Sequence, residues 1–142
     1  MSVKRFVSNI ECRKISCPEE IIRQRCISYM IQKGYPKHFI AIEKSLTSFP
    51  HLKGMLVPNR KIDIICFASI AQCGFSPLIL LECKANKLCK RAFHQILGYN
   101  YYVQANFIAV VGLEKIFVMD KACQKKWNDL PLYVDLLKLC TK

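Results

Sequence analysis

The sequence lacks the long apolar runs and the short motifs that would assign it to several common protein classes. Its apolar runs, such as 107–113, fall far short of the ~20 residues that span a bilayer, so we expect no membrane association. The N-terminal segment is basic but has no apolar stretch typical of a secretory signal, which favours a cytoplasmic location. There is no P-loop, no GxGxxG fingerprint and no GxSxG elbow, which argues against the nucleotide-binding and hydrolase classes that carry them.

Cysteine is abundant, but its arrangement excludes the usual cysteine-based sites. The nine cysteines are odd in number and form no CxxC pair, and several lie inside apolar segments such as IDIICF and LLECK. The three histidines are isolated, and none has metal-ligand spacing with a cysteine. We therefore expect buried free thiols in a reducing cytosol, with no zinc site and no disulfide-linked partner.

Acidic residues are scarce relative to basic ones. The 142 residues include 22 Lys and Arg against 10 Asp and Glu, which gives a formal charge of +12. Such an excess is typical of nucleic-acid binders, although it also suits a solvated surface that keeps copies of the chain apart. The lysines are spread along the whole chain, which argues against a basic amphipathic membrane helix. With 52% hydrophobic residues, the chain can form one packed domain.

The hydrophobic pattern predicts eight elements in the order α-β-β-β-α-β-β-α. Pro18 suits the first turn of a helix, two acids there complement its dipole, and Gly34 ends it. The expected helices cover 18–33, 86–104 and 130–140, and the expected strands cover 38–46, 60–69, 77–84, 106–113 and 114–120. A turn over 72–77 predicts an antiparallel hairpin. We expect a basic arm over 1–16, followed by a single α/β (α+β) domain over 17–142 with helices flanking a mixed sheet.

Three charged residues lie in two strands that are expected to pair. Asp63 interrupts an apolar strand, and Glu82 and Lys84 lie at the end of the next one. Because strand side chains alternate, Glu82 and Lys84 point to one face and Cys83 to the other. If the strands pair, Asp63 lies beside Glu82, and the two carboxylates repel each other unless a cation such as Mg²⁺ relieves the conflict. The pattern indicates either a metal site or a strand-end salt bridge from Lys84 to one of the acids.

A series of motifs in a fixed order resembles one protein family. The motifs are PEEIIRQ (18–24), GYP (34–36), IAIEKS (40–45), RKIDII (60–65), LILLECK (78–84) and HQILGYN (94–100). They resemble the stand-alone form of the N-terminal nuclease domain of type I restriction enzyme R subunits, in the PD-(D/E)xK superfamily. The resemblance implies a restriction-endonuclease-like fold with an αβββαβ core. Ile62 stands where the superfamily's name has Pro, and the helicase motor is absent, so the restriction-subunit function does not transfer.

The resemblance also implies roles for the three charged residues. Asp63 and Glu82 would bind Mg²⁺ or Mn²⁺ together with the main-chain carbonyl of Cys83, and Lys84 would be the catalytic lysine. This set implies a metal-dependent deoxyribonuclease.

Residues on the two helices would complete that site. Gln95 and Tyr99 would form the QxxxY element, and their spacing places both on one helix face. Glu20 would be the first-helix acid that reaches the site, with Glu19 as the alternative. Without the resemblance, a half-buried helix face explains the first pair, and dipole complementation explains the acids. Glu43 is either an additional site acid or a solvent-facing residue of its strand.

Basic residues near the expected site are candidates for contact with nucleic acid, most plausibly DNA. These are Arg60, Lys87, Lys90 and Arg91, with Tyr99 beside them. The leading hypothesis is a metal-dependent endonuclease acting on DNA. The alternatives are a catalytically idle nucleic-acid-binding module on the same fold and a protein-interaction domain with an acidic partner. The sequence leaves open the choice between DNA and RNA, and whether the chain forms a homodimer.

Overall fold

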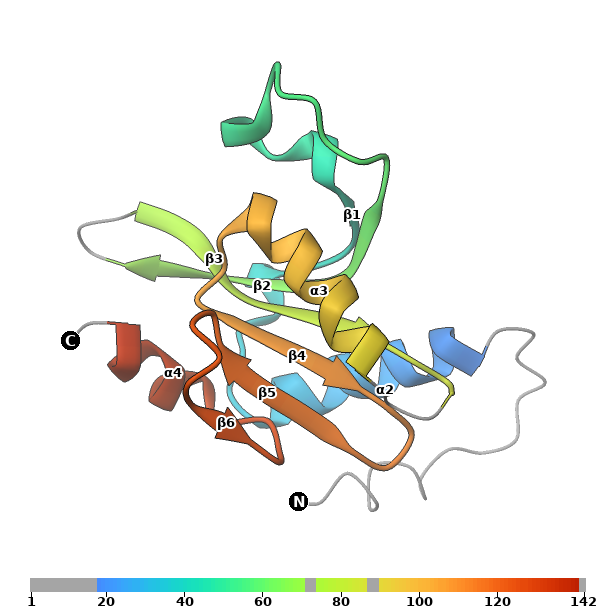
Figure 1. Ribbon diagram of the computed structural model, residues 1–142. Helices are drawn as coiled ribbons and strands as arrows, with labels where there is room; N and C mark the ends of the chain where they lie inside the picture. Colours follow the sequence, from blue (N-terminus) through green and yellow to red (C-terminus); the bar gives the residue numbers. More distant parts are fainter. Residues whose placement is uncertain (1–17, 71–73, 87–89, 141–142) are drawn as a thin grey trace.

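The computed structural model describes residues 18–70, 74–86 and 90–140 (Figure 1). The expected arm over 1–16 lies outside these ranges. The α-helices within them are α2 (Pro18–Gln32), α3 (Lys90–Val103) and α4 (Tyr133–Cys140). The strands are β1 (Ile40–Ser45), β2 (Lys61–Ile70), β3 (Gly74–Cys83), β4 (Phe107–Val111), β5 (Ile116–Asp120) and β6 (Lys126–Trp127). The expected order of elements is confirmed, and the short β6 is an addition that the sequence pattern did not indicate.

The strands form one six-stranded mixed sheet in the order β1-β2-β3-β4-β5-β6. Strands β3 and β4 are parallel, and the other neighbours are antiparallel, which includes the expected β2–β3 hairpin. The turn expected over 72–77 is shorter, because β3 begins at Gly74 and runs through Pro77. The β2–β3 register shifts between Cys66 and Phe67, next to the position opposite Pro77, and proline is tolerated at such a bulge because it has no N–H to donate.

Helices cover both faces of the sheet. In Figure 1, α3 lies in front of the sheet and α2 behind it. On the α2 side, Ile22 and Cys26 pack with Ile64, Leu81 and other sheet residues, and Leu136 of α4 joins the same cluster. A second cluster on the α3 side joins residues of that helix to alternate residues of the central strands. Because the central strands are buried on both faces, their sequences are nearly continuous apolar runs.

Helix α2 ends as its sequence predicts. Gly34 has a φ of +89° and follows the helix. The Tyr35 N–H donates to the Met30 carbonyl and the Gly34 N–H to the Ile31 carbonyl, at 3.0 and 3.1 Å, which is the Schellman pattern. Buried Tyr35 then donates its hydroxyl hydrogen to the Pro131 carbonyl at 2.9 Å, so the end of α2 is tied to the C-terminal segment.

The connection between β1 and β2 forms a small projecting lobe, seen at the top of Figure 1. We call residues 46–60 the β1–β2 lobe. It contains two 3-10 turns, η2 (Leu46–Ser48) and η3 (Pro50–Leu52), where the sequence pattern indicated an irregular loop. Leu46, Phe49 and Leu52 are buried in the cluster on the α3 side. One side of the lobe therefore packs on the rest of the domain, and the tip of the lobe extends away from the domain.

Helix α3 begins at Lys90 rather than at 86, since 84–86 are not helical. Two other helix ends differ from the expected positions for local reasons. Helix α4 begins at Tyr133 rather than at 130, since Pro131 precedes it. Helix α3 ends at Val103 without a glycine, because Gln104 adopts a φ of 63°. Buried Asn100 replaces the missing stop signal, since its side chain donates to the Ala105 carbonyl and accepts from the Ala105 N–H, at 3.0 and 2.7 Å.

Among the described residues, no helix is long and apolar enough to cross a membrane.

Candidate active site

Strand pairing brings Asp63 and Glu82 side by side. The β2–β3 ladder pairs Ile64 with Leu81, so the next positions toward this end of the sheet are Asp63 and Glu82. Residues directly opposite each other in an antiparallel pair share a face of the sheet. The Cys83 N–H donates to Asp63 Oδ2 at 2.8 Å, which fixes this carboxylate against the end of β3. The juxtaposition expected from strand alternation is thus present in the structure.

Glu82 is the most constrained acid of the site. It is 6% exposed, and its Oε1 lies 3.7 Å from Lys84 Nζ and 3.4 Å from the Gln95 Nε2 donor. Its second oxygen, Oε2, is buried and has no hydrogen-bond partner. Burial, and after it the charge of Asp63, raise the pKa of Glu82 to about 8 against the opposing charge of Lys84. The site therefore resists the ionised form of Glu82 unless a further cation is present.

Asp63 experiences a similar conflict. Burial raises the pKa of its carboxyl group, and the hydrogen bond from the Cys83 N–H lowers it. The charge of Glu19 raises the same pKa, while the charges of Arg23 and Lys84 lower it. The last residue of β3 thus donates an N–H to a carboxylate of β2, and the charge of Lys84, the next residue, acts on the same carboxylate. One buried acid, Glu82, and one half-buried acid, Asp63, lie beside a single lysine, so ionisation of both carboxylates would leave negative charge that Lys84 alone does not balance.

Helix α3 contributes the expected polar pair. Gln95 and Tyr99 lie one helical turn apart, and Gln95 Nε2 donates to the Tyr99 hydroxyl at 2.8 Å as well as to Glu82. Both side chains are half-buried. Gln95 therefore connects the helix to the carboxylate of β3, which is the placement that the QxxxY resemblance implies.

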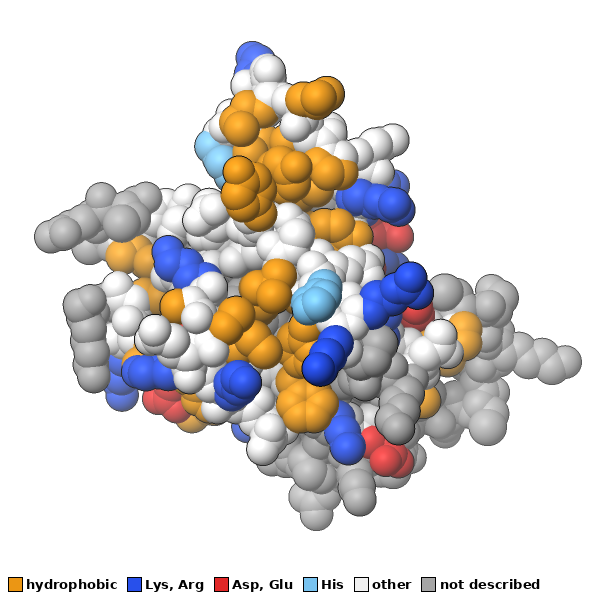
Figure 2. All heavy atoms as spheres, in the orientation of Figure 1, with side chains coloured by type: hydrophobic (Ala, Val, Ile, Leu, Met, Phe, Trp, Pro, Cys, Tyr) orange, Lys and Arg blue, Asp and Glu red, His pale blue; other side chains and the backbone are white. Residues whose placement is uncertain are grey.

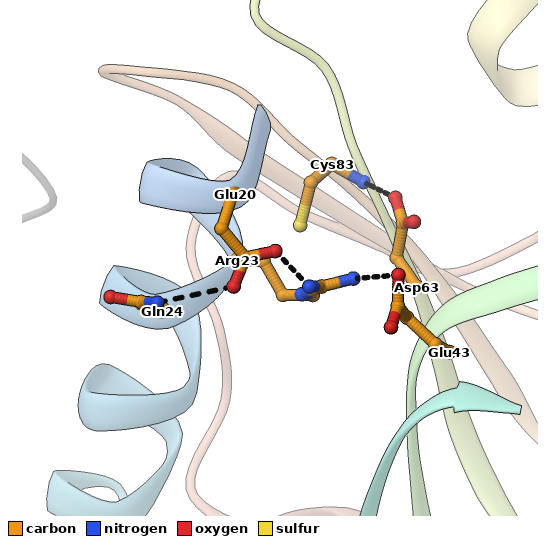
Figure 3. Close-up of polar contacts among 6 residues, drawn as sticks. All are labelled: Glu20, Arg23, Gln24, Glu43, Asp63 and Cys83. Atoms are coloured by element: carbon orange, nitrogen blue, oxygen red, sulfur yellow. Dashed lines mark hydrogen bonds and ion pairs between the residues drawn. The ribbon is translucent and has the colours of Figure 1, made fainter. Parts of the chain in front are cut away.

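Glu20 is the α2 acid that we expect at the site. It lies beside Arg23, which no sequence motif indicates as a site residue (Figure 3). Arg23 forms an ion pair with Glu20, and its Nη1 lies 3.2 Å from Glu43 Oε1 on β1. Gln24 also donates to Glu20 at 3.1 Å. The i, i+3 spacing of Glu20 and Arg23 signals their pairing in the sequence, whereas nothing local signals the contact with Glu43.

The structure places the two neighbouring acids of α2 in different environments. Glu20 is taken up by Arg23 and Gln24, whereas the charge of Glu19 raises the pKa of both Asp63 and Glu82. Glu19 is therefore the α2 acid whose charge acts on both central carboxylates. Its side chain is exposed, so it can reorient toward a ligand at the site.

Glu43 has a strained backbone next to Asp63. Its φ of 49° lies in the left-handed region, which costs on the order of 1 kcal/mol for a residue with a side chain. The β1–β2 ladder pairs Ile42 with Ile64 and Lys44 with Ile62, so Glu43 occupies the position opposite Asp63 in this register. Its carboxylate is exposed and contacts Arg23, which ties β1 to α2 at the edge of the site.

The basic candidates lie on the surface. Arg60 is exposed at the start of β2, and Lys90 and Arg91 are exposed in the first turn of α3, while Lys87 lies outside the described residues. Figure 2 shows basic side chains gathered over the face that α3 covers. The side chains of Arg60, Lys90 and Arg91 are exposed and lie outside the core, so they are available to contact a phosphate backbone.

The residues present suit a hard divalent cation. Asp63 and Glu82 supply carboxylate oxygens, and the buried, unpartnered Oε2 of Glu82 lacks the hydrogen bond that a buried polar atom normally has. Mg²⁺ is usually bound by one or two carboxylates with waters completing its shell. Within residues 18–70, 74–86 and 90–140, no group of three or more His, Cys, Asp or Glu side chains is arranged around a common metal position. The site thus offers two side-chain ligands, and the Cys83 carbonyl follows Glu82 directly in the chain.

Comparison with known proteins identifies one family. The family model described as type I restriction enzyme R protein N terminus matches residues 18–131. The matched segment includes α2, all six strands and α3, and therefore every described residue of the candidate site. A search of curated proteins finds no match. The resemblance drawn from the motifs is confirmed, and the family supports a nuclease-like role.

Proposed function

Since the chain belongs to the family of type I restriction enzyme R protein N-terminal domains, we propose that it is a metal-dependent endonuclease that hydrolyses phosphodiester bonds of DNA. One observation carries the proposal. Glu82 is a buried carboxylate whose Oε2 has no partner, and it lies beside Asp63 and within 3.7 Å of the Lys84 ammonium group. An arrangement maintained only for stability would pair that oxygen, because an unpaired buried acceptor costs free energy.

Mg²⁺ or Mn²⁺ is the cofactor that these residues support. Asp63 and Glu82 would hold it with the main-chain carbonyl of Cys83. When bound, the ion supplies Lewis acidity for the phosphate and acidifies water at neutral pH. Asp63 is held in position by the Cys83 N–H, and Glu82 by Lys84 and Gln95, so both ligand oxygens are positioned before a metal arrives.

Lys84 supplies the positive charge that the reaction needs. Its ammonium group is partly exposed, at 25% of the side chain, so it can contact a phosphate at the surface while it pairs with Glu82. A cation aimed at a phosphate stabilises the charge that develops in the transition state. Gln95 orients Glu82 from α3, and the exposed Lys90 and Arg91 of the same helix bind the phosphate backbone on either side of the reacting group.

A nucleic-acid-binding module without activity is the second candidate. It is favoured by one observation, namely that the described residues present two central carboxylates and no third side-chain ligand around the same point.

In either case the five described cysteines are free thiols, which suits the reducing cytoplasm where we place the protein.

A cleavage experiment distinguishes the two candidates. Single-turnover cleavage of plasmid, single-stranded and branched DNA is measured with Mg²⁺, and DNA affinity is measured separately with Ca²⁺. Replacement of Lys84 by alanine should slow cleavage by ~10²–10³ while affinity changes much less, because its charge acts mainly in the transition state. The control is Lys115→Ala, an exposed lysine between β4 and β5, which should cut at the wild-type rate.

Two results would overturn the proposal. If wild type and Lys84→Ala cut at the same rate, the cleavage comes from another site or from a contaminant. If wild type binds DNA tightly but cuts none of the three substrates with Mg²⁺ or Mn²⁺, the binding module is the correct function.

A further inference from the structure

The tip of the β1–β2 lobe exposes apolar side chains to an unusual degree. Leu56 is 99% exposed and Met55 is 57% exposed, the two highest values among large aliphatic side chains of the described residues. Gly54 precedes them with a φ of +80° and has open space around it, so the chain turns sharply at this point. Two adjacent exposed apolar side chains at the end of a projecting lobe contribute little to folding, and they suit contact with a partner.

The base of the lobe is firmly attached, so the exposure of its tip is a property of the fold. Leu46, Phe49 and Leu52 are buried with residues of α3 and the sheet. His51 Nε2 lies 2.9 Å from the Tyr102 carbonyl oxygen at the end of α3. The Leu46 N–H donates to the carbonyl of residue 60 at 3.0 Å and closes the lobe at its base. The tip is therefore presented on a fixed support.

The charge along the lobe and at its base is of one sign. Between Glu43 and Asp63 the sequence contains no acidic residue, and it contains four basic residues, Lys44, Lys53, Arg60 and Lys61. Lys53, Arg60 and Lys61 are exposed, and Lys44 extends over the Phe49 ring with its Nζ 4.9 Å from the ring centre. The partner of this surface must therefore present negative charge outside and apolar surface inside. Duplex DNA has this combination in its phosphates and stacked bases.

The lobe also lies close to the candidate active site. Arg60 ends the lobe, and Asp63 follows three residues later in β2. In Figure 2 the lobe projects above the α3 face, where apolar side chains gather on it next to basic ones. A nucleic acid whose phosphate reaches Asp63 and Glu82 would therefore pass beside the lobe. An anionic membrane would satisfy the charge and the apolar tip, but it would give no reason for their position next to a pair of carboxylates.

We propose that the β1–β2 lobe is a DNA-contacting element, in which Met55 and Leu56 insert against the bases while Lys53, Arg60 and Lys61 hold the adjacent phosphates. This inference rests on the proposed function, since it assigns to the lobe the same DNA that the site would cut. Apolar side chains that wedge between base steps partly unstack them. The lobe would thus select DNA steps that open easily and place the adjoining phosphate at the carboxylates.

The test uses a short DNA duplex with 2-aminopurine, whose fluorescence rises when it is unstacked, and Ca²⁺ to prevent cleavage. Combined replacement Met55→Ala and Leu56→Ala should weaken binding by about tenfold and remove the fluorescence rise. The single change Leu56→Met should retain both, because it keeps an apolar side chain of similar size. Leu132→Ala removes the same atoms from another exposed leucine, outside the lobe, and should change neither. The melting temperature of the tip variant should equal that of wild type.

The outcomes separate this proposal from the proposed function. If the tip variant binds, unstacks and cuts DNA as wild type does, the role of the lobe is refuted while the nuclease assignment stands. If wild type neither binds nor cuts DNA, both proposals fail. Binding to phosphatidylserine vesicles that depends on the tip, without any effect of the tip on DNA binding, would make the lobe a membrane contact and overturn the inference.

Discussion

Replacement of Glu82 by glutamine should stabilise the metal-free protein at alkaline pH. The change keeps the size and shape of the side chain and removes its charge. In the wild type, burial and the charge of Asp63 raise the pKa of Glu82 from 4.5 to about 8. The ionised carboxylate is therefore less stable in the folded chain than in the unfolded chain, where water surrounds it.

The sign and the size of the effect follow from this shift. An acid whose pKa is higher in the folded chain stabilises the fold at pH values below its pKa in the unfolded chain. This stabilisation is lost as the pH rises through its pKa in the folded chain. Each pKa unit corresponds to about 1.4 kcal/mol, so the rise of the Glu82 pKa from 4.5 to about 8 corresponds to a cost of about 5 kcal/mol above pH 8. The free energy of unfolding of wild type should fall between about pH 4.5 and pH 8. In Glu82→Gln, the part of this decrease in the free energy of unfolding that Glu82 causes should be absent.

Urea unfolding measured from pH 4.5 to pH 8.5, in a chelating buffer, provides the assay. Glu114→Gln, which removes an exposed acid from the turn between β4 and β5, is the control and should follow the wild-type curve. Addition of Mg²⁺ at pH 8 should raise the stability of wild type and leave that of Glu82→Gln almost unchanged, because the ion binds the folded carboxylate pair. A variant less stable than wild type at pH 8.5 would refute the reasoning about burial and charge.

Three further outcomes are expected. Arg23→Gln should lower the free energy of unfolding by about 1–3 kcal/mol, because it removes the half-buried charge that pairs with Glu20 and Glu43; urea unfolding of both proteins at pH 7 checks this. Gly98→Ala should raise stability by about 0.5–1 kcal/mol in thermal melts, since the glycine lies inside α3 with open space around it. Lys90→Gln and Arg91→Gln should each reduce the slope of log affinity against log salt for DNA by about one, measured by titration at several salt concentrations.

Much of the fold was predictable from local signals. The order of elements follows from apolar spacing, and α2 follows from Pro18, its two first-turn acids and Gly34. Local signals failed where a long-range contact decides the outcome. β3 runs through Pro77 because the bulge accommodates it, and α3 stops because Asn100 hydrogen-bonds the Ala105 backbone. The two-residue β6 forms by pairing with β5, and its own sequence carries no signal for a strand.

The candidate site divides in the same way. The alternation of side chains along a strand predicts that Glu82 and Lys84 share a face, and the hairpin predicts Asp63 beside them. The different contacts of Glu19 and Glu20 were not predictable, because the two acids are adjacent in the sequence and differ only in what the packed helix places beside them. The contact between Arg23 and Glu43 joins residues 20 positions apart, and the left-handed backbone of Glu43 has no signature in its residue type.

By itself, the sequence determined the order of helices and strands, the excess positive charge and the face that each charged strand residue occupies. These properties depend on backbone stereochemistry and composition, which act between near neighbours. Only the tertiary structure decided that Glu82 is buried with an unpartnered oxygen, that Arg23 links α2 to β1, and that Leu56 extends from a fixed lobe. Burial and charge interactions depend on distances through space, and packing sets these distances between segments remote in the chain.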